Sequence, residues 1–120
     1  MPQQIPDEVL EVMASKFRML SDPTRLSILR TLMEQGERNV GQVVEATGGS
    51  QANISKHLKQ LAEAGLIARR KEGLNVLYRL DDPVIEKICH LVCQTILKEF
   101  KAQARQGHKL LRGEERGDKK

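Results

Sequence analysis

The stretch that most constrains the fold is a pair of glycines followed by a segment with a helical pattern. Gly48 and Gly49 are followed by residues 50–65, Ser-Gln-Ala-Asn-Ile-Ser-Lys-His-Leu-Lys-Gln-Leu-Ala-Glu-Ala-Gly. In this segment the apolar residues recur at three- and four-residue steps and form one stripe: Ile54, Leu58, Leu61 and Ala62. Two consecutive glycines permit a sharp turn, and Ser50 is a favourable N-cap. We therefore predict a helix over residues 50–65 that begins directly after a tight turn.

The polar residues of this segment share one chemistry. They are hydrogen-bonding or cationic, and no acid occurs before Glu63: Ser50, Gln51, Asn53, Ser55, Lys56, His57, Lys59 and Gln60. Amide and hydroxyl groups can pair with base edges, and lysines with guanine or phosphate. We predict that these residues contact double-stranded DNA. An ordinary solvated helix face is the alternative, but it does not explain the turn before the helix or the basic segment after it.

The segments before the two glycines carry helical signals of their own. Residues 7–20 form an amphipathic pattern, and Ser21 or Asp22 can cap a second helix that begins at Pro23 and ends at Gly36. Asn39 can cap a short third helix that the glycines close. The third and fourth helices then form a helix-turn-helix, an arrangement in which the second helix enters the major groove.

After Gly65 the apolar period changes from that of a helix to that of a strand. Residues 66–72 and 75–80 are predicted to form a β-hairpin that carries polar candidates for DNA contact: Arg69, Arg70, Lys71 and Asn75. A basic hairpin after a helix-turn-helix is a wing. Because neighbouring strand residues point to opposite faces, Arg70 and Lys71 cannot both contact DNA equally. The alternative is that these charges only keep an exposed hairpin from aggregating.

The last predicted helix starts after Asp81-Asp82-Pro83, and its apolar stripe is wider than one small domain can cover. We expect a second subunit to cover it, together with the helix over residues 7–20. The predicted interface of this homodimer is formed by Val9, Val12, Met13, Ile85, Ile88, Cys89, Val92, Cys93 and Ile96. The domain organisation expected is a flexible N-terminus (1–6), a DNA-binding and dimerisation domain (7–105) and a disordered basic tail (106–120).

Cys89 and Cys93 are one helical turn apart and therefore lie on the same face of the last helix. If this face meets its twofold mate, four thiols could gather near the dimer axis. One interpretation is a reversible cysteine modification or a soft metal ion, with His90 as an additional ligand. The other interpretation is that both cysteines fill the subunit seam as small apolar residues. No other metal ligand or cofactor is predicted.

Composition narrows the class of protein. Residues 50–80 carry six basic and two acidic side chains, so positive charge gathers where DNA contact is predicted. Aromatic residues make up only 2% of the chain, which disfavours binding of single strands by base stacking. We expect no membrane helix, no signal peptide and a cytoplasmic protein. No phosphate-binding glycine loop or nucleophile motif occurs, so we predict no enzyme.

Three segments together resemble a known family. Residues 21–29 (Ser-Asp-Pro-Thr-Arg-Leu-x-Ile-Leu), residues 50–67 and the wing pattern Arg70-x-x-Gly73-x-x-Val76-x-Tyr78-x-Leu80 resemble the ArsR/SmtB transcriptional repressors. The resemblance implies a mainly α fold with a small β-hairpin, a winged helix-turn-helix of four helices, two strands and a fifth helix. It further implies a homodimer through the first and last helices that binds an operator with dyad symmetry. Such repressors are released by a metal ion or a thiol-reactive signal.

The metal sites of this family are not matched. Members that sense arsenic or cadmium carry a Cys-x-Cys pair in the third helix, and residues 40–45 have no such pair. Zinc-type members place Asp-x-His and His-x-x-Glu on the last helix; only Asp82 matches, and the other positions hold Val84, Thr95 and Lys98. The expected function is a repressor released by a thiol-reactive or soft-metal signal at the dimer helices. The alternative is a ligand-independent winged-helix protein controlled by abundance or by a protein partner.

Overall fold

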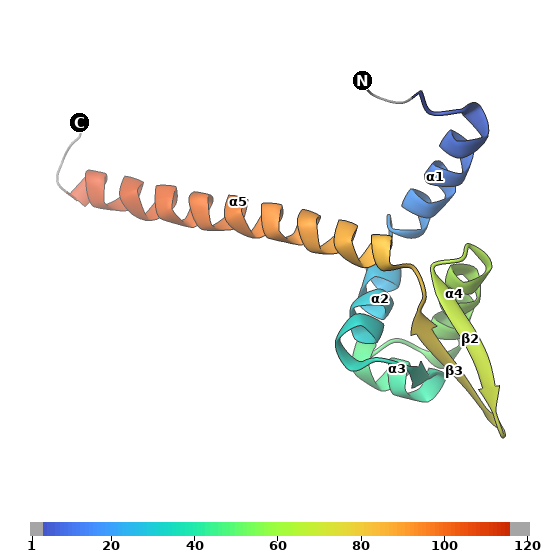
Figure 1. Ribbon diagram of the computed structural model, residues 1–120. Coiled ribbons are helices and arrows are strands. Elements are labelled where there is room, and N and C mark those ends of the chain that lie inside the picture. Colours follow the sequence, from blue (N-terminus) through green and yellow to red (C-terminus); the bar gives the residue numbers. More distant parts are fainter. Residues whose placement is uncertain (1–3, 116–120) are drawn as a thin grey trace. The chain divides into compact units, whose positions relative to one another are not determined.

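The computed structural model describes residues 4–115, with side chains to residue 107. Its elements are, in chain order, α1 (Asp7–Met19), α2 (Pro23–Gln35), β1 (Arg38–Asn39), α3 (Val40–Thr47), α4 (Gln51–Glu63), β2 (Ile67–Glu72), β3 (Asn75–Leu80) and α5 (Pro83–Glu115) (Figure 1). The chain divides into two compact units, one that ends at Pro83 and one that begins at Val84. The predicted order of helices and hairpin strands is confirmed.

The core of the first unit is formed by α2, α3 and α4, which pack against one another and against the sheet (Figure 1). Helices α2 and α4 contribute apolar residues at helical spacing and α3 contributes one, while β2, β3 and the residue just before β2 add three more. The buried side chains are Ile28, Leu29, Leu32, Val43, Ile54, Leu58, Leu61, Leu66, Ile67 and Tyr78. Burying one such aliphatic side chain stabilises the fold by roughly 1.5–3 kcal/mol. The core therefore fixes α4 by one side and leaves its other side exposed.

Both glycines between α3 and α4 are required by the geometry of the turn. Gly48 ends α3 in the left-handed conformation, with φ of 79°, and its N–H donates to the carbonyl of Val44 at 2.8 Å. A Cβ on Gly49 would lie 2.9 Å from Cδ1 of Ile54, which is fully buried. Ser50 then begins α4, and its hydroxyl accepts a hydrogen bond from the N–H of Asn53 at 3.2 Å. The predicted tight turn and N-cap are both present.

The wing belongs to a three-stranded antiparallel sheet in the order β1-β3-β2. The two residues of β1 pair with β3, the central strand, with Arg38 opposite Tyr78 and Asn39 opposite Leu77. Sequence reasoning predicted only the hairpin, because a two-residue strand has no periodicity of its own. The additional strand joins the connection between α2 and α3 to the base of the wing.

Helix α5 is longer than predicted and continues to Glu115. The prediction of a disordered tail over residues 106–120 is therefore wrong for residues 106–115, and residues 116–120 lie outside the described part. This stretch is rich in residues that favour helices, such as Gln, Lys, Leu and Arg, and each of its two glycines costs only about 1 kcal/mol. Of the N-terminal segment predicted to be flexible, residues 4–6 have no regular secondary structure. Among the described residues, no helix has the length and apolar character needed to span a membrane.

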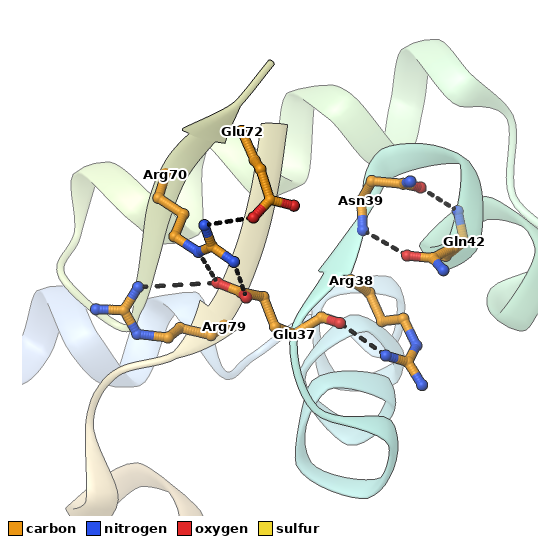
Figure 2. A network of polar contacts seen from close by, with 7 residues as sticks. All are labelled: Glu37, Arg38, Asn39, Gln42, Arg70, Glu72 and Arg79. Carbon is orange, nitrogen blue, oxygen red and sulfur yellow. Dashed lines mark hydrogen bonds and ion pairs between the residues drawn. The ribbon is translucent and has the colours of Figure 1, made fainter. Parts of the chain in front are cut away.

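The N-cap of α3 gives a test of the fold. The Asn39 side chain accepts from the Gln42 N–H at 2.8 Å, and the Gln42 side chain accepts from the Asn39 N–H at 2.9 Å (Figure 2). We expect Asn39→Ala to lower the free energy of unfolding by about 1 kcal/mol, because it leaves N–H groups of the first turn unpaired. Urea denaturation measures the loss. Glu45→Ala, on the exposed side of α3, is the control, and an equal loss from both variants would contradict the role of the cap.

Candidate nucleic-acid interface

The outward side of α4 is polar, as predicted. Four of the predicted DNA contacts in the helix are exposed, and two more are half-buried at its edges: Gln51, Asn53, Lys56 and Lys59, then Ser55 and Gln60. Since residues three and four apart lie on one face of a helix, Lys56 and Lys59 lie opposite the buried stripe that contains Ile54 and Leu61. Gln51 and Asn53 lie at the N-terminal end of the same surface. This surface can offer amide and cationic donors to DNA.

His57 lies on the other side of the helix. It is only 8% exposed, and its Nδ1 is 3.4 Å from Nη1 of Arg25. His57 was predicted to belong to the polar surface, and the structure corrects this placement. Residue 57 follows Ile54 by three positions and precedes Leu61 by four, so it belongs to the buried stripe. His57 therefore contributes to packing and to a contact with α2, and we do not retain it as a DNA contact.

Arg25 connects three helices. Its Nε donates to the carbonyl of Met19 at 3.0 Å and its Nη2 to the carbonyl of Arg18 at 3.0 Å, which ties down the end of α1. Its Nη1 lies 3.5 Å from Oε1 of Gln60 as well as next to His57, both on α4. We call these contacts the Arg25 junction. In the sequence Arg25 was only one residue of the family pattern, and no local signal predicted this junction.

The backbone of Arg25 also takes part in the cap of α2. Its N–H donates to Oδ2 of Asp22 at 2.9 Å. This hydrogen bond, together with the positive charge of Arg25, holds the pKa of the Asp22 carboxyl below its usual range. The carboxylate is therefore charged at neutral pH and caps α2 as predicted. The start of α2 and the position of α4 are thus set by the same arginine.

The wing separates the predicted basic residues onto two faces. Arg70 lies on the face that also carries Glu72 and Arg79, and its guanidinium is paired with Glu37 (Figure 2). The hydrogen bonds from Arg70 are the main reason that the pKa of Glu37 lies below its usual value. Contact with Glu37 and Glu72 also raises the pKa of Arg70. Arg70 is therefore occupied within the protein.

The opposite face of the wing carries the remaining basic residues. Arg69 is opposite Tyr78 and Lys71 is opposite Val76 in the antiparallel register, and both basic side chains are exposed. Asn75 is opposite Glu72, so it belongs to the face of Arg70. Arg70 and Lys71 lie on opposite faces of the hairpin, so they cannot both contact DNA equally. The surface best suited to phosphate therefore consists of Arg69 and Lys71 together with the lysines of α4.

The cysteines of α5 are both free thiols. Cys89 is half-buried and Cys93 is exposed, and burial raises the pKa of Cys89. Within the described residues, no group of three His, Cys, Asp or Glu side chains could hold a metal ion. His90 is adjacent to Cys89 in the chain and points in a different direction around the helix. One described chain therefore has no complete metal site.

The residues predicted for the dimer interface differ in exposure. Val9, Val12, Val92, Cys93 and Ile96 are exposed, and Met13, Ile88 and Cys89 are half-buried. Ile85 is different, because it is only 2% exposed in the single chain. It lies in the first turn of α5, and its place in the interface stays a prediction, as it does for the other residues.

These features define a class of protein: a helix-turn-helix followed by a basic β-hairpin is a winged helix-turn-helix that binds DNA. The model of the family "Bacterial regulatory protein, arsR family" matches residues 22–69. The chain is 42% identical over 82 residues to the HTH-type transcriptional regulator MJ1325 of Methanocaldococcus jannaschii, covering 68% of this chain and 92% of that protein. It is 34% identical over 88 residues to a probable mercury resistance operon repressor of Streptomyces lividans, covering 73% and 70%.

A solved structure agrees with these sequence matches. The homodimeric winged helix-turn-helix DNA-binding domain of Mb0332 from Mycobacterium bovis superposes with a TM-score of 0.67 at 32% identity, covering 82% of this chain and 92% of that one. The chain belongs to the arsR family. It is a DNA-binding transcriptional repressor and not an enzyme. The family, fold class and absence of enzymatic function predicted from the sequence are confirmed.

Proposed function

We propose that two copies of this chain bind double-stranded operator DNA of dyad symmetry through α4 and the wing, and thereby repress transcription. The observation that carries this proposal is the outward surface of α4, which presents amides and lysines while the core holds its opposite side. In such dimers the two reading helices enter successive major grooves, about 34–36 Å apart. Because its target is the DNA of the cell, we place the protein in the cytoplasm.

Exposed apolar residues on α1 and α5, together with Ile5 just before α1, support a homodimer. A single chain leaves uncovered Ile5, Val9, Leu10, Val12 and Phe17, and on α5 Val84, Leu91, Val92, Ile96, Leu97 and Phe100. Apolar surface on this scale marks an association site, because exposing it to water is unfavourable. The Mb0332 domain is described as homodimeric, which agrees with a second copy as the covering partner.

The contacts with DNA divide into two kinds. Gln51 and Asn53 carry amides that can pair with adenine edges, so we assign base recognition to them. Lys56 and Lys59 can bind guanine or phosphate, and Ser50 and Ser55 can reach either. Gln60 already takes part in the Arg25 junction, so we assign it a smaller part in base recognition. On the wing we assign phosphate contacts to Arg69 and Lys71.

Two substitutions test this division on α4. Gln51→Ala should reduce the preference for operator over random DNA, because it removes a base contact worth about 1–3 kcal/mol. Lys59→Ala should weaken binding to both DNAs and lower the slope of log K against log salt by about one. Fluorescence anisotropy at several salt concentrations measures both quantities. Equal effects of the two variants on operator and random DNA would contradict the assignment.

For the signal, we propose a thiol-reactive species or a soft metal ion that acts at Cys89 and Cys93. The two thiols share one face of α5, and Cys93 is exposed. Thiolates are preferred ligands of soft metals, and the similarity to a protein named as a mercury resistance repressor agrees with this class of signal. Since one described chain has no complete site, the second copy would supply the remaining thiols. A change at these helices would alter the spacing of the two α4 helices and release the DNA.

One observation favours the alternative of a repressor controlled by its abundance or by a protein partner. Burial raises the pKa of Cys89, so less of its thiol is in the reactive thiolate form at neutral pH. In that case Cys89 and Cys93 only fill the space between subunits.

Combined substitution of the cysteines separates the two possibilities. If the thiols receive the signal, then Cys89→Ser with Cys93→Ser should bind operator DNA normally but stay bound when Hg²⁺, hydrogen peroxide or a persulfide is added. The wild-type protein should lose at least tenfold in affinity with one of these reagents, equal to about 1.4 kcal/mol. Anisotropy measures release, and intact mass reports the modification. Release of the double variant at wild-type reagent concentrations would eliminate the thiol mechanism.

A further inference from the structure

Glu37 lies in the connection between α2 and β1, yet its side chain is joined to the wing. Nε of Arg70 donates to Oε2 of Glu37 and Nη2 donates to Oε1, each at 2.8 Å. Figure 2 shows the guanidinium facing the carboxylate with both pairs of atoms aligned. A bidentate pair of this kind fixes the orientation of the arginine as well as its distance. The contact therefore constrains how the wing is rotated relative to the helix-turn-helix.

Further acids surround the two arginines on this face of the hairpin. Nη1 of Arg70 donates to Glu72 at 3.2 Å. Arg79 lies 4.0 Å from Glu37 and 3.8 Å from Asp81. Three carboxylates thus accompany two guanidinium groups, so this face offers no net positive charge to a phosphate. We call it the paired face of the wing.

Arg69 and Lys71 occupy the opposite face. The same face carries Ile67 and Tyr78, which are buried in the first unit, whereas Arg69 and Lys71 are exposed to solvent. Neither forms an ion pair with any residue in the described part of the chain. We call it the open face of the wing.

We propose that Glu37 is a positioning residue for DNA binding: by holding Arg70 on the paired face, it directs Arg69 and Lys71 toward the phosphate backbone. This inference rests on the proposed binding of DNA by α4 and the wing. The strand β1 pairs only with Tyr78 and Leu77, so beyond these residues the wing is a two-stranded hairpin. An isolated hairpin is only marginally ordered in water. Arg70, the partner of Glu37, is opposite Leu77 and therefore lies where the support from β1 ends on the side of the hairpin tip.

Glu37 has an electrostatic effect and a positioning effect on the affinity for DNA, and the two have opposite signs. An acid near a DNA-binding surface repels phosphates, so its removal alone should strengthen binding. Loss of positioning should weaken binding, because Arg69 and Lys71 would no longer be held in place. Exposed ion pairs contribute little to stability, so the variants should unfold close to the wild-type midpoint. The sign of the change in affinity therefore distinguishes the two roles.

The test uses the full chain and a DNA duplex that the wild-type protein selects from a random-sequence library. Glu37→Gln should bind this duplex roughly tenfold more weakly, the value of one lost charge-assisted contact, with a smaller salt slope. Glu37→Asp keeps the charge but shortens the side chain, and it should also bind more weakly. Glu34→Gln removes the same charge from an exposed position on α2 and should bind as tightly as wild type or more tightly. Thermal unfolding is measured for every variant.

A double-mutant cycle identifies the route of the effect. Arg69→Ala should cost much less in the Glu37→Gln background than in the wild-type protein, because the contact is already lost. Tighter binding by Glu37→Gln, or an undiminished cost of Arg69→Ala in that background, would overturn the positioning role while leaving the proposed function intact. A wild-type protein that enriches no duplex would instead overturn the proposed function itself.

Discussion

The orientation of α4, the helix that we expect to enter the major groove, depends on the guanidinium of Arg25. This group donates to carbonyls at the end of α1 and lies against His57 and Gln60 of α4, while its own backbone completes the cap of α2. A planar arginine fork can make several directed hydrogen bonds at once, which a lysine ammonium cannot do with the same geometry. The apolar core sets the depth of α4 against α2 and α3. The Arg25 junction adds directional contacts that orient α4 about its axis.

A second arginine orients the wing in a similar way. In both places a polar residue of the expected DNA surface is used inside the protein: His57 at the Arg25 junction and Arg70 against Glu37. The surface left for DNA is therefore smaller than the total of basic and polar residues suggests. It also has a more defined shape, since Lys56, Lys59, Arg69 and Lys71 extend from elements whose other sides are held. Such contacts contribute more to orientation than to stability, because partly exposed ion pairs stabilise a fold only weakly.

Much of the fold was predictable because its signals are local. Asp22, Asn39 and Ser50 all cap helices as their positions in the chain suggested, and the glycines between α3 and α4 form the predicted turn. The strand β1 was missed because its two residues are defined only by their pairing with β3. The true length of α5 was missed because charged residues with good helix propensity resemble a disordered tail in composition.

The candidate site was predictable to a lesser degree. The spacing of His57 from Ile54 and Leu61 already indicated the buried side, but its polar character led to the opposite assignment. The partner of Arg70 is 33 residues away in the chain, and no local pattern reveals such a pair. The family resemblance predicted the class of function, since several motifs occur in the correct order. It did not predict the signal to which the repressor responds, because other residues occupy the positions of the family's metal ligands.

The central claim is that one side of α4 and the open face of the wing contact DNA. The most direct test is a map of backbone amide chemical shifts during titration of the full chain with the selected duplex. The account predicts that the largest changes occur at Gln51, Asn53, Lys56 and Lys59 and at Arg69 and Lys71, with small changes at Glu37 and Arg70. Changes centred on the paired face of the wing or on the exposed side of α2, with α4 unaffected, would contradict it.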